Sequence, residues 1–314
     1  MRIDRGVRSW IGSLSLLLLS VCNLQAADPI FRVDGYLPDY RAGAVPAEVA
    51  HLLTDLTLFS VEVSADGSLN EKRWTAKQWD ASKAIRSRPG LRTHICVGGW
   101  DRSAGFPAIC HSPVARKKLG QELVAYCRQH ALAGVNLDWE HPSTAAEQRD
   151  FANLLTELQP VFKTAQLELS IAVAPSQKLP AEAWAAVDHV MLMSYDDAGK
   201  HSTFESTQKH LGMLLEQGVP AGKVVLCVPL YGRQVETREA LTYGEIIQKY
   251  APRPDIDEVD GIFFNGPGTI AAKTAWAQSV GLAGVAVWEL GQDAPGEASL
   301  LKQIRRTVRE PRPR

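Results

Sequence analysis

Eight short apolar runs recur along the chain and constrain its fold more than any other feature. Most are rich in β-branched residues and apolar on both faces, which is typical of parallel strands that are covered by helices. The runs cover residues 30–36, 55–60, 92–97, 134–139, 167–173, 189–194, 223–228 and 283–288.

Helical segments fill most of the gaps between these runs. Apolar residues recur at helical spacing in 116–130, 144–161, 204–217 and 269–280. Gly218 and Gly281 follow the last two segments, where glycine commonly ends a helix. Eight strands alternating with helices predict an α/β fold, a single (β/α)8 TIM barrel. The competing architecture is a doubly wound open sheet, which usually has a glycine-rich phosphate turn after its first strand. Residues 35–38 do not supply that turn.

The first 27 residues differ from the rest. Arg2, Arg5 and Arg8 precede an apolar stretch over 14–21, and small residues follow up to Ala27. This order is typical of a cleavable secretory signal, and the apolar stretch is shorter than the ~20 residues of a membrane span. A buried N-terminal helix is the alternative. We expect cleavage near Ala26, one domain over 28–304, a basic tail over 305–314, and a secreted or periplasmic protein without membrane contact.

Charge and cysteine usage exclude several functions. The formal net charge is −1, so no broad basic surface is available for nucleic acid. Cys96 and Cys227 lie in apolar runs, whereas Cys110 and Cys127 flank a helical segment and could pair. Neither a CxxC pair nor a closely spaced histidine accompanies them, and we predict no metal and no cofactor. We expect a monomer.

Polar side chains alternate along the fourth run. Asn136, Asp138 and Glu140 are two residues apart, so all three point to one face of a strand. In a barrel that face is the interior, and Glu140 comes last, at the carboxyl end where barrel enzymes have their active sites. Neighbouring carboxylates raise the pKa of one of them, as a general acid requires. The alternative is a strand end that turns into solvent.

Aromatic residues recur at the same predicted rim. Met193 and Tyr195 share a face at the end of the sixth run, and Trp288 ends the eighth. Tyr36, Phe59 and Trp100 end the first three runs. An inward tryptophan could form the floor of a sugar site, whereas packed core aromatics are the alternative.

Five segments, in order along the chain, resemble motifs of the family 18 glycoside hydrolases, the chitinases and their relatives. Residues 134–140 (GVNLDWE) resemble the family signature DGxDxDxE. The others are CVGG at 96–99, MSYD at 193–196, PLYGR at 229–233 and WELGQD at 288–293.

This resemblance implies substrate-assisted hydrolysis with retention, acting on a glycan that contains N-acetylglucosamine, such as chitin or chito-oligosaccharides. Glu140 would be the general acid, Asp138 would hold the acetamido N–H, and Tyr195 would hydrogen-bond the acetamido oxygen. Asn136 and Asp196 complete the predicted catalytic set. The predicted substrate-binding residues are Trp288, Met193, Tyr36, Phe59, Gly99, Trp100 and Tyr231.

The chain departs from the family pattern at four positions. Ala133 and Asn136 replace two signature aspartates, Cys96 replaces a serine, and His141 replaces the usual aromatic residue. Two alternative functions stay open, a lectin-like barrel without catalysis and a glucosaminidase directed at peptidoglycan or N-glycans. The stretch 229–282 leads us to expect an open groove, because it is too short for the α+β insertion of many exo-acting relatives.

Overall fold

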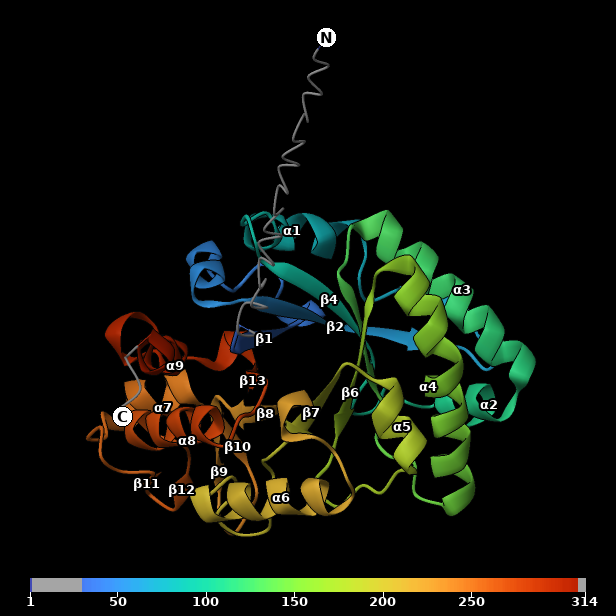
Figure 1. Ribbon diagram of the computed structural model, residues 1–314. Helices are drawn as coiled ribbons and strands as arrows, with labels where there is room; N and C mark the ends of the chain where they lie inside the picture. Colours follow the sequence, from blue (N-terminus) through green and yellow to red (C-terminus); the bar gives the residue numbers. More distant parts are fainter. Residues whose placement is uncertain (2–29, 310–314) are drawn as a thin grey trace.

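The computed structural model describes Met1 and residues 30–309, and the predicted signal segment 1–27 lies almost wholly outside these residues. A closed barrel of parallel strands forms its centre (Figure 1). The strands are β1 (Arg32–Pro38), β2 (Asp55–Val63), β4 (Arg92–Gly98), β5 (Gly134–Asp138), β6 (Glu168–Val173), β7 (His189–Met193), β8 (Val224–Pro229) and β13 (Gly284–Trp288). Because β1 pairs in parallel with both β2 and β13, the sheet closes on itself. The predicted (β/α)8 barrel is confirmed.

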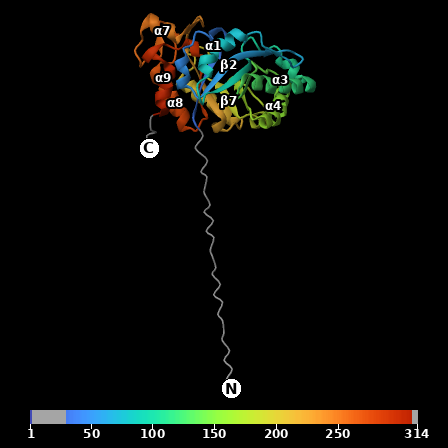
Figure 2. The same ribbon diagram turned by 90° about the horizontal axis from the view of Figure 1, so that it is seen from above.

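Helices cover the outside of the barrel. Figure 2 shows α3 and α4 on one side of it and α7, α8 and α9 on the opposite side. The bounds are α1 (Ala76–Arg86), α2 (Phe106–His111), α3 (Pro113–His130), α4 (Ala145–Ala165), α5 (Ala181–Ala186), α6 (Phe204–Glu216), α7 (Tyr243–Tyr250), α8 (Pro267–Ser279) and α9 (Leu300–Arg309). The four predicted helical segments are confirmed as α3, α4, α6 and α8. None of the described helices is both long and apolar enough to cross a membrane.

Local sequence explains where the helices begin and end. At the start of α4, the Thr144 side chain accepts from the Glu147 N–H, and the Glu147 carboxylate accepts from the Thr144 N–H. This capping box satisfies two backbone donors that an uncapped helix would leave free. Gly218 and Gly281 follow α6 and α8 with φ of 84° and 75°, a conformation in which glycine has no steric penalty.

The C-terminal boundary predicted at residue 304 lies inside a helix. The last helix, α9, runs through Arg309, so the first half of the predicted basic tail is helical. Leu301 and Ile304 are buried, and Val308 packs against the core. This spacing gives α9 one apolar face. The arginines between these residues make the segment basic overall, so its composition alone suggested a tail. Residues 310–314 lie outside the described part of the chain.

The stretch between β8 and β13 contains a second, smaller sheet. The strands β9 (Tyr231–Gln234), β10 (Ala240–Thr242), β11 (Glu258–Val259) and β12 (Ile262–Phe263) pair antiparallel in the order β10-β9-β12-β11. A further short strand, β3 (Leu69–Asn70), pairs with β2. A small sheet does fit into 229–282, because strands of two to four residues need very little chain. The expected open groove, which rested on the lack of the larger insertion of exo-acting relatives, stays a prediction.

Alternate residues of each barrel strand face two different apolar regions. On β5, Val135 and Leu137 belong to the large core between the barrel and the helices, whereas Asn136 and Asp138 make contacts inside the barrel. Eight buried residues form the apolar part of the interior, Tyr36, Phe59, Cys96, Ala172, Met191, Val225, Cys227 and Ala286. Cys96, Cys110, Cys127 and Cys227 are all buried free thiols, so the pairing considered for Cys110 and Cys127 is not formed.

Candidate active site

A cavity of about 540 Å³ lies where the barrel strands end at their carboxyl termini. Every predicted site residue lines it except Asn136 and Gly99. The lining residues predicted from the sequence are Tyr36, Phe59, Trp100, Asp138, Glu140, Met193, Tyr195, Asp196, Tyr231 and Trp288. The strands thus bring residues that are up to 252 positions apart (Tyr36 to Trp288) into one site.

Asp138 lies at the bottom of this cavity and is only 3% exposed. Its Oδ2 lies 4.0 Å from the Cys96 thiol, which donates to it, and its Oδ1 has no hydrogen-bond partner within the described structure. Burial and the charge of Glu140 raise the pKa of Asp138 well above its ordinary value. An unpartnered buried carboxylate oxygen is costly, so it marks a place where a ligand N–H would be stabilised.

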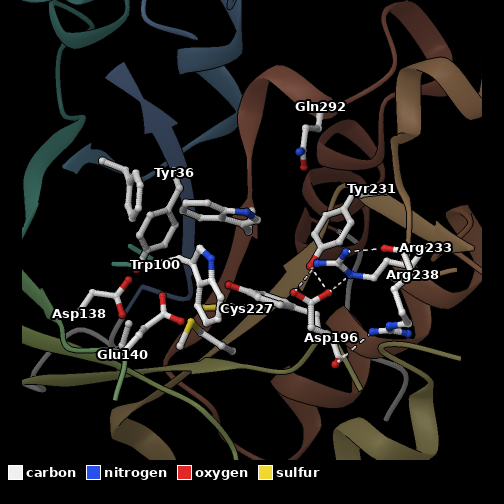
Figure 3. A pocket seen from close by; sticks show the side chains of 16 residues that line it. Tyr36, Trp100, Asp138, Glu140, Asp196, Cys227, Tyr231, Arg233, Arg238 and Gln292 are labelled. Carbon is white, nitrogen blue, oxygen red and sulfur yellow. Dashed lines mark hydrogen bonds and ion pairs between the residues drawn. The ribbon is translucent and has the colours of Figure 1, made fainter. Parts of the chain in front are cut away.

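Glu140 follows Asp138 on the same face of β5 (Figure 3). Burial raises its pKa to about 7, with Asp196 and Asp101 adding to the rise and the Trp100 N–H opposing it. The Glu140 N–H donates to Ser103 Oγ at 3.1 Å, and Ser103 Oγ also bonds the Asp138 carbonyl at 3.0 Å. The chain on either side of the two carboxylates is therefore fixed, and Glu140 is protonated over much of the acid-to-neutral range.

Asn136 lies below the cavity and does not bond to Asp138. Its Oδ1 accepts from the Tyr36 hydroxyl at 3.0 Å, and its Nδ2 donates to Ser170 Oγ at 3.0 Å. Asn136 is 1% exposed and absent from the cavity lining, so its predicted catalytic role stays a prediction and would act through the residues that it bonds. It supports the floor of the site through Tyr36 and Ser170.

Gly99 also lies outside the cavity lining. Its backbone N–H donates to the Asp138 carbonyl at 2.7 Å, with φ of 98°. A Cβ at this position would lie 2.3 Å from the Phe59 ring, so only glycine allows the chain to pass there. Gly99 thus makes room for Phe59 beside Asp138, and its predicted role in substrate binding stays a prediction.

Trp288 forms an aromatic wall with two other predicted residues. Its ring centroid lies 5.5 Å from that of Tyr36 and 4.7 Å from that of Phe59, the latter in an edge-to-face arrangement. The Arg102 guanidinium lies 4.6 Å from the Phe59 ring on the opposite flank. These contacts fix the orientation of Trp288, and a fixed indole is suited to stack on the apolar face of a sugar ring.

Asp196 and Tyr195 differ in charge, because the pKa of Asp196 is lowered and that of Tyr195 is raised. Burial alone would raise the pKa of Asp196, but bonds from Arg233 and from the Tyr231 hydroxyl (2.8 Å) lower it. Burial raises the pKa of Tyr195 well above its ordinary value, so the phenol keeps its proton. Asp196 is thus a carboxylate fixed by Arg233, while Tyr195 is a neutral donor at the cavity wall.

Six further lining residues were not predicted, the apolar Ala172, Cys227 and Ala240 and the polar Arg233, Arg238 and Gln292. Arg233 and Gln292 lie within the PLYGR and WELGQD segments, so the motifs contained a signal for them. Arg238 lies in the hairpin between β9 and β10, where the sequence pattern gives none.

At the opposite end of the barrel, Asp55, His94 and Glu168 bring possible metal-ligating atoms within 4.8 Å of one another. Arg92 pairs with both carboxylates, at 2.8 Å and 2.9 Å, and Arg32 pairs with Glu168 at 2.5 Å. The two guanidinium groups already balance the two carboxylates. This cluster is therefore an ion-pair network, which a cation could enter only against those charges.

Comparisons with known proteins agree with this geometry. The model of the glycosyl hydrolases family 18 matches residues 34–293. Chitinase 1 of Aphanocladium album is 25% identical, over 85% of this chain and 81% of the relative. The crystal structure of the family 18 chitinase ChiB of Flavobacterium johnsoniae has a TM-score of 0.78 and 27% identity, over 88% of this chain and 94% of that one.

A family 18 chitinase mutant from Cycas revoluta, crystallised in complex with (GlcNAc)4, has the same fold. Its TM-score is 0.76 at 22% identity, over 88% of this chain and 99% of that one. The family match runs from within β1 to beyond β13 and includes every residue of the cavity lining. The chain belongs to the glycosyl hydrolases family 18 and is a glycoside hydrolase.

Proposed function

We propose that this glycoside hydrolase cleaves β-1,4-linked N-acetylglucosamine polymers or oligomers of the chitin type. The observation that carries the proposal is Glu140, a buried acid with a pKa of about 7 that faces a cavity walled by Trp288. Relatives named as chitinases, and the (GlcNAc)4 bound to the Cycas revoluta chitinase mutant, support this class of glycan.

In the proposed first step, Glu140 gives its proton to the glycosidic oxygen, and the bond from that oxygen to the anomeric carbon breaks. The acetamido oxygen of the same sugar forms a bond to the anomeric carbon, giving an oxazolinium ion. The leaving chain departs as a neutral alcohol. Family 18 is among the exceptions to the rule that retaining glycosidases use a second carboxylate as the nucleophile.

In the second step, the Glu140 carboxylate takes a proton from water, and the water oxygen bonds to the anomeric carbon. The bond between the acetamido oxygen and the anomeric carbon breaks, so the acetamido group re-forms and the configuration is retained. Asp138 stabilises the intermediate, because its unpartnered Oδ1 can accept the acetamido N–H. Tyr195, with its raised pKa, donates its hydroxyl to the acetamido oxygen.

A panel of oligomers tests this proposal. The purified protein should release shorter products from N-acetylglucosamine oligomers, read by mass spectrometry, and leave cellulose oligomers intact. A thiazoline analogue of N-acetylglucosamine, which mimics the oxazolinium ion, should inhibit competitively. Cleavage of cellulose oligomers would point instead to a carboxylate nucleophile and would refute the role given to Asp138.

We also propose that the protein is exported after cleavage near Ala26 and acts as a secreted or periplasmic monomer. The basic, apolar and small-residue order of residues 1–27 supports export. N-terminal sequencing of the protein from the extracellular or periplasmic fraction tests the cleavage site. Size-exclusion chromatography with light scattering tests the monomer.

A further inference from the structure

Arg238 brings a positive charge to the cavity from an unexpected element. It lies in the hairpin between β9 and β10 and lines the same cavity as Glu140 and Trp288. Figure 3 shows it on the side of Asp196 and Arg233, across the cavity from Asp138 and Glu140. The two carboxylates of β5 and this guanidinium therefore stand on different walls.

The guanidinium of Arg238 is held only by neutral groups. Its Nη1 donates to the Gly199 carbonyl at 2.9 Å, and its Nη2 donates to the Asp196 carbonyl at 3.3 Å. Within residues 30–309, none of the ion pairs closer than 4.0 Å involves Arg238. Its neighbour Arg233 differs, because two of its nitrogens bond to the Asp196 carboxylate.

These contacts fix the guanidinium in place but leave its charge unbalanced. Arginine has five N–H donors in a planar fork, and the two carbonyls accept from two of them. That fork matches a carboxylate, which can accept two parallel hydrogen bonds. A glycan made only of hydroxyl and acetamido groups gives such a charge no counterpart.

We propose that Arg238 binds a carboxylate carried by the glycan, so that the enzyme prefers N-acetylhexosamine oligomers that contain acidic sugars. This inference rests on the proposed function and narrows its substrate class. The acidic group must lie toward Arg238, because the opposite wall, with Asp138 and Glu140, offers it no positive charge. The positive charge of Arg238 disfavours a sugar with a free amino group beside it.

The carboxylate could come from a lactyl ether, as in N-acetylmuramic acid, or from a uronic acid. The experiment therefore uses three oligomers of equal length, one alternating N-acetylglucosamine with N-acetylmuramic acid, one alternating it with glucuronic acid, and one of N-acetylglucosamine alone. A fourth is the muramic oligomer with its carboxyl groups reduced to alcohols. It has the same shape without the charge.

Binding is measured by calorimetry with the Glu140→Gln protein, which separates affinity from turnover, and kcat/KM is measured with the parent protein. At least one acidic oligomer should bind about tenfold more tightly than its neutral counterpart. The preference should shrink as salt is added, because Arg238 is partly exposed. The oligomer that shows the preference identifies the source of the carboxylate.

Arg238→Gln keeps an N–H donor for the carbonyls but removes the charge, and it should abolish the acidic preference in binding and in kcat/KM. Arg253→Gln is the matched control, because Arg253 is exposed, pairs with Asp255 and lies outside the cavity. Arg253→Gln should prefer acidic over neutral oligomers to the same extent as the parent protein. Equal affinity of the Glu140→Gln protein for acidic and neutral oligomers overturns this inference. It leaves the proposed function intact if the parent protein cleaves N-acetylglucosamine oligomers.

Discussion

At the scale of single residues, the chemistry depends on one proton of Glu140. Glu140→Gln keeps the shape of the side chain but has no proton to give, so turnover should fall by a factor on the order of 10² or more. In the parent protein, the rate should decline as the pH rises through about 7, because burial raises the pKa of Glu140 to that value and only the protonated form is active.

Initial rates on one soluble oligomer from pH 4 to 9 would test both statements, and calorimetry would show that sugar binding survives in the variant. Near-parental turnover of Glu140→Gln would remove Glu140 as the general acid. It would show that another group supplies the proton.

Asn136 gives a second test at this scale. The carboxylate in Asn136→Asp can still accept from the Tyr36 hydroxyl, and Ser170 can rotate to donate to it. The added negative charge beneath Asp138 and Glu140 should raise the pKa of Glu140, moving the alkaline limb of the rate profile upward by roughly one pH unit. Rate profiles of both proteins on the same oligomer decide the matter. Superimposable alkaline limbs would show that residue 136 does not tune the acid.

The residue scale also shows where sequence reasoning stops. The two-residue period of β5 predicted that Asn136, Asp138 and Glu140 share a face, because that rule is local. The bond from Tyr36 to Asn136 joins residues 100 positions apart and depends on the register around the whole barrel. No local pattern encodes it, so the sequence could not show that Asn136 supports the floor of the site through Tyr36.

At the scale of elements, local patterns predicted the long elements and missed the short ones. The barrel strands and α3, α4, α6 and α8 carry clear periodicity or capping signals. The strands β11 and β12 have two residues each, which is too few to show any period. They form because they pair with each other and with β9. The hairpin between β9 and β10, which carries Arg238, could therefore not be predicted from the sequence.

The capping box of α4 gives a prediction for one element. Thr144→Ala removes the side-chain acceptor for the Glu147 N–H, which lies 3.1 Å away, and should lower the free energy of unfolding by about 1 kcal/mol. Thr164→Ala is the control on the same helix, because the Thr164 hydroxyl only bonds the Pro160 carbonyl, at 2.8 Å. Urea unfolding of both variants measures the difference. Equal midpoints would mean that the cap contributes nothing measurable.

At the scale of the whole molecule, the two ends of the barrel do different work. The carboxyl end contains a cavity with an unpartnered Asp138 oxygen, a partly neutral acid and an unpaired guanidinium. The amino end contains a closed network of Arg32, Asp55, Arg92, His94 and Glu168. The first end leaves polar groups free for a substrate, whereas the second pairs its charges with one another, although Asp55 Oδ1 and His94 Nδ1 have no hydrogen-bond partner in the described residues. We therefore expect the ion pairs of the amino end to stabilise the barrel.

Glu168 tests that view. Its Oε1 accepts from Arg92 at 2.9 Å, and its Oε2 accepts from Arg32 at 2.5 Å, with His94 3.2 Å away. Burial alone would raise the pKa of Glu168, but His94 and Arg32 outweigh it and hold that pKa well below its ordinary value. Glu168→Gln leaves the guanidinium groups without this charge, and the free energy of unfolding at pH 7 should fall by about 2 kcal/mol, less than for a fully buried pair.

The pH dependence of that loss fixes its cause. A carboxyl whose pKa is lowered in the folded state stabilises the protein above its unfolded pKa of about 4.3, and this contribution disappears as the pH falls below that value. The parent should therefore lose stability more steeply than Glu168→Gln between about pH 5 and pH 2, and the gap between the two proteins should narrow. Asp34, whose pKa burial raises to about 6, makes the stability of both proteins change with pH in the opposite direction, and to the same extent.

Glu157→Gln, which breaks the more exposed pair with Arg116, is the control and should change stability little. Urea unfolding at pH 7, 5 and 3 measures all three proteins, and a gap that stays constant with pH would show that packing, not the charge of Glu168, holds the amino end together.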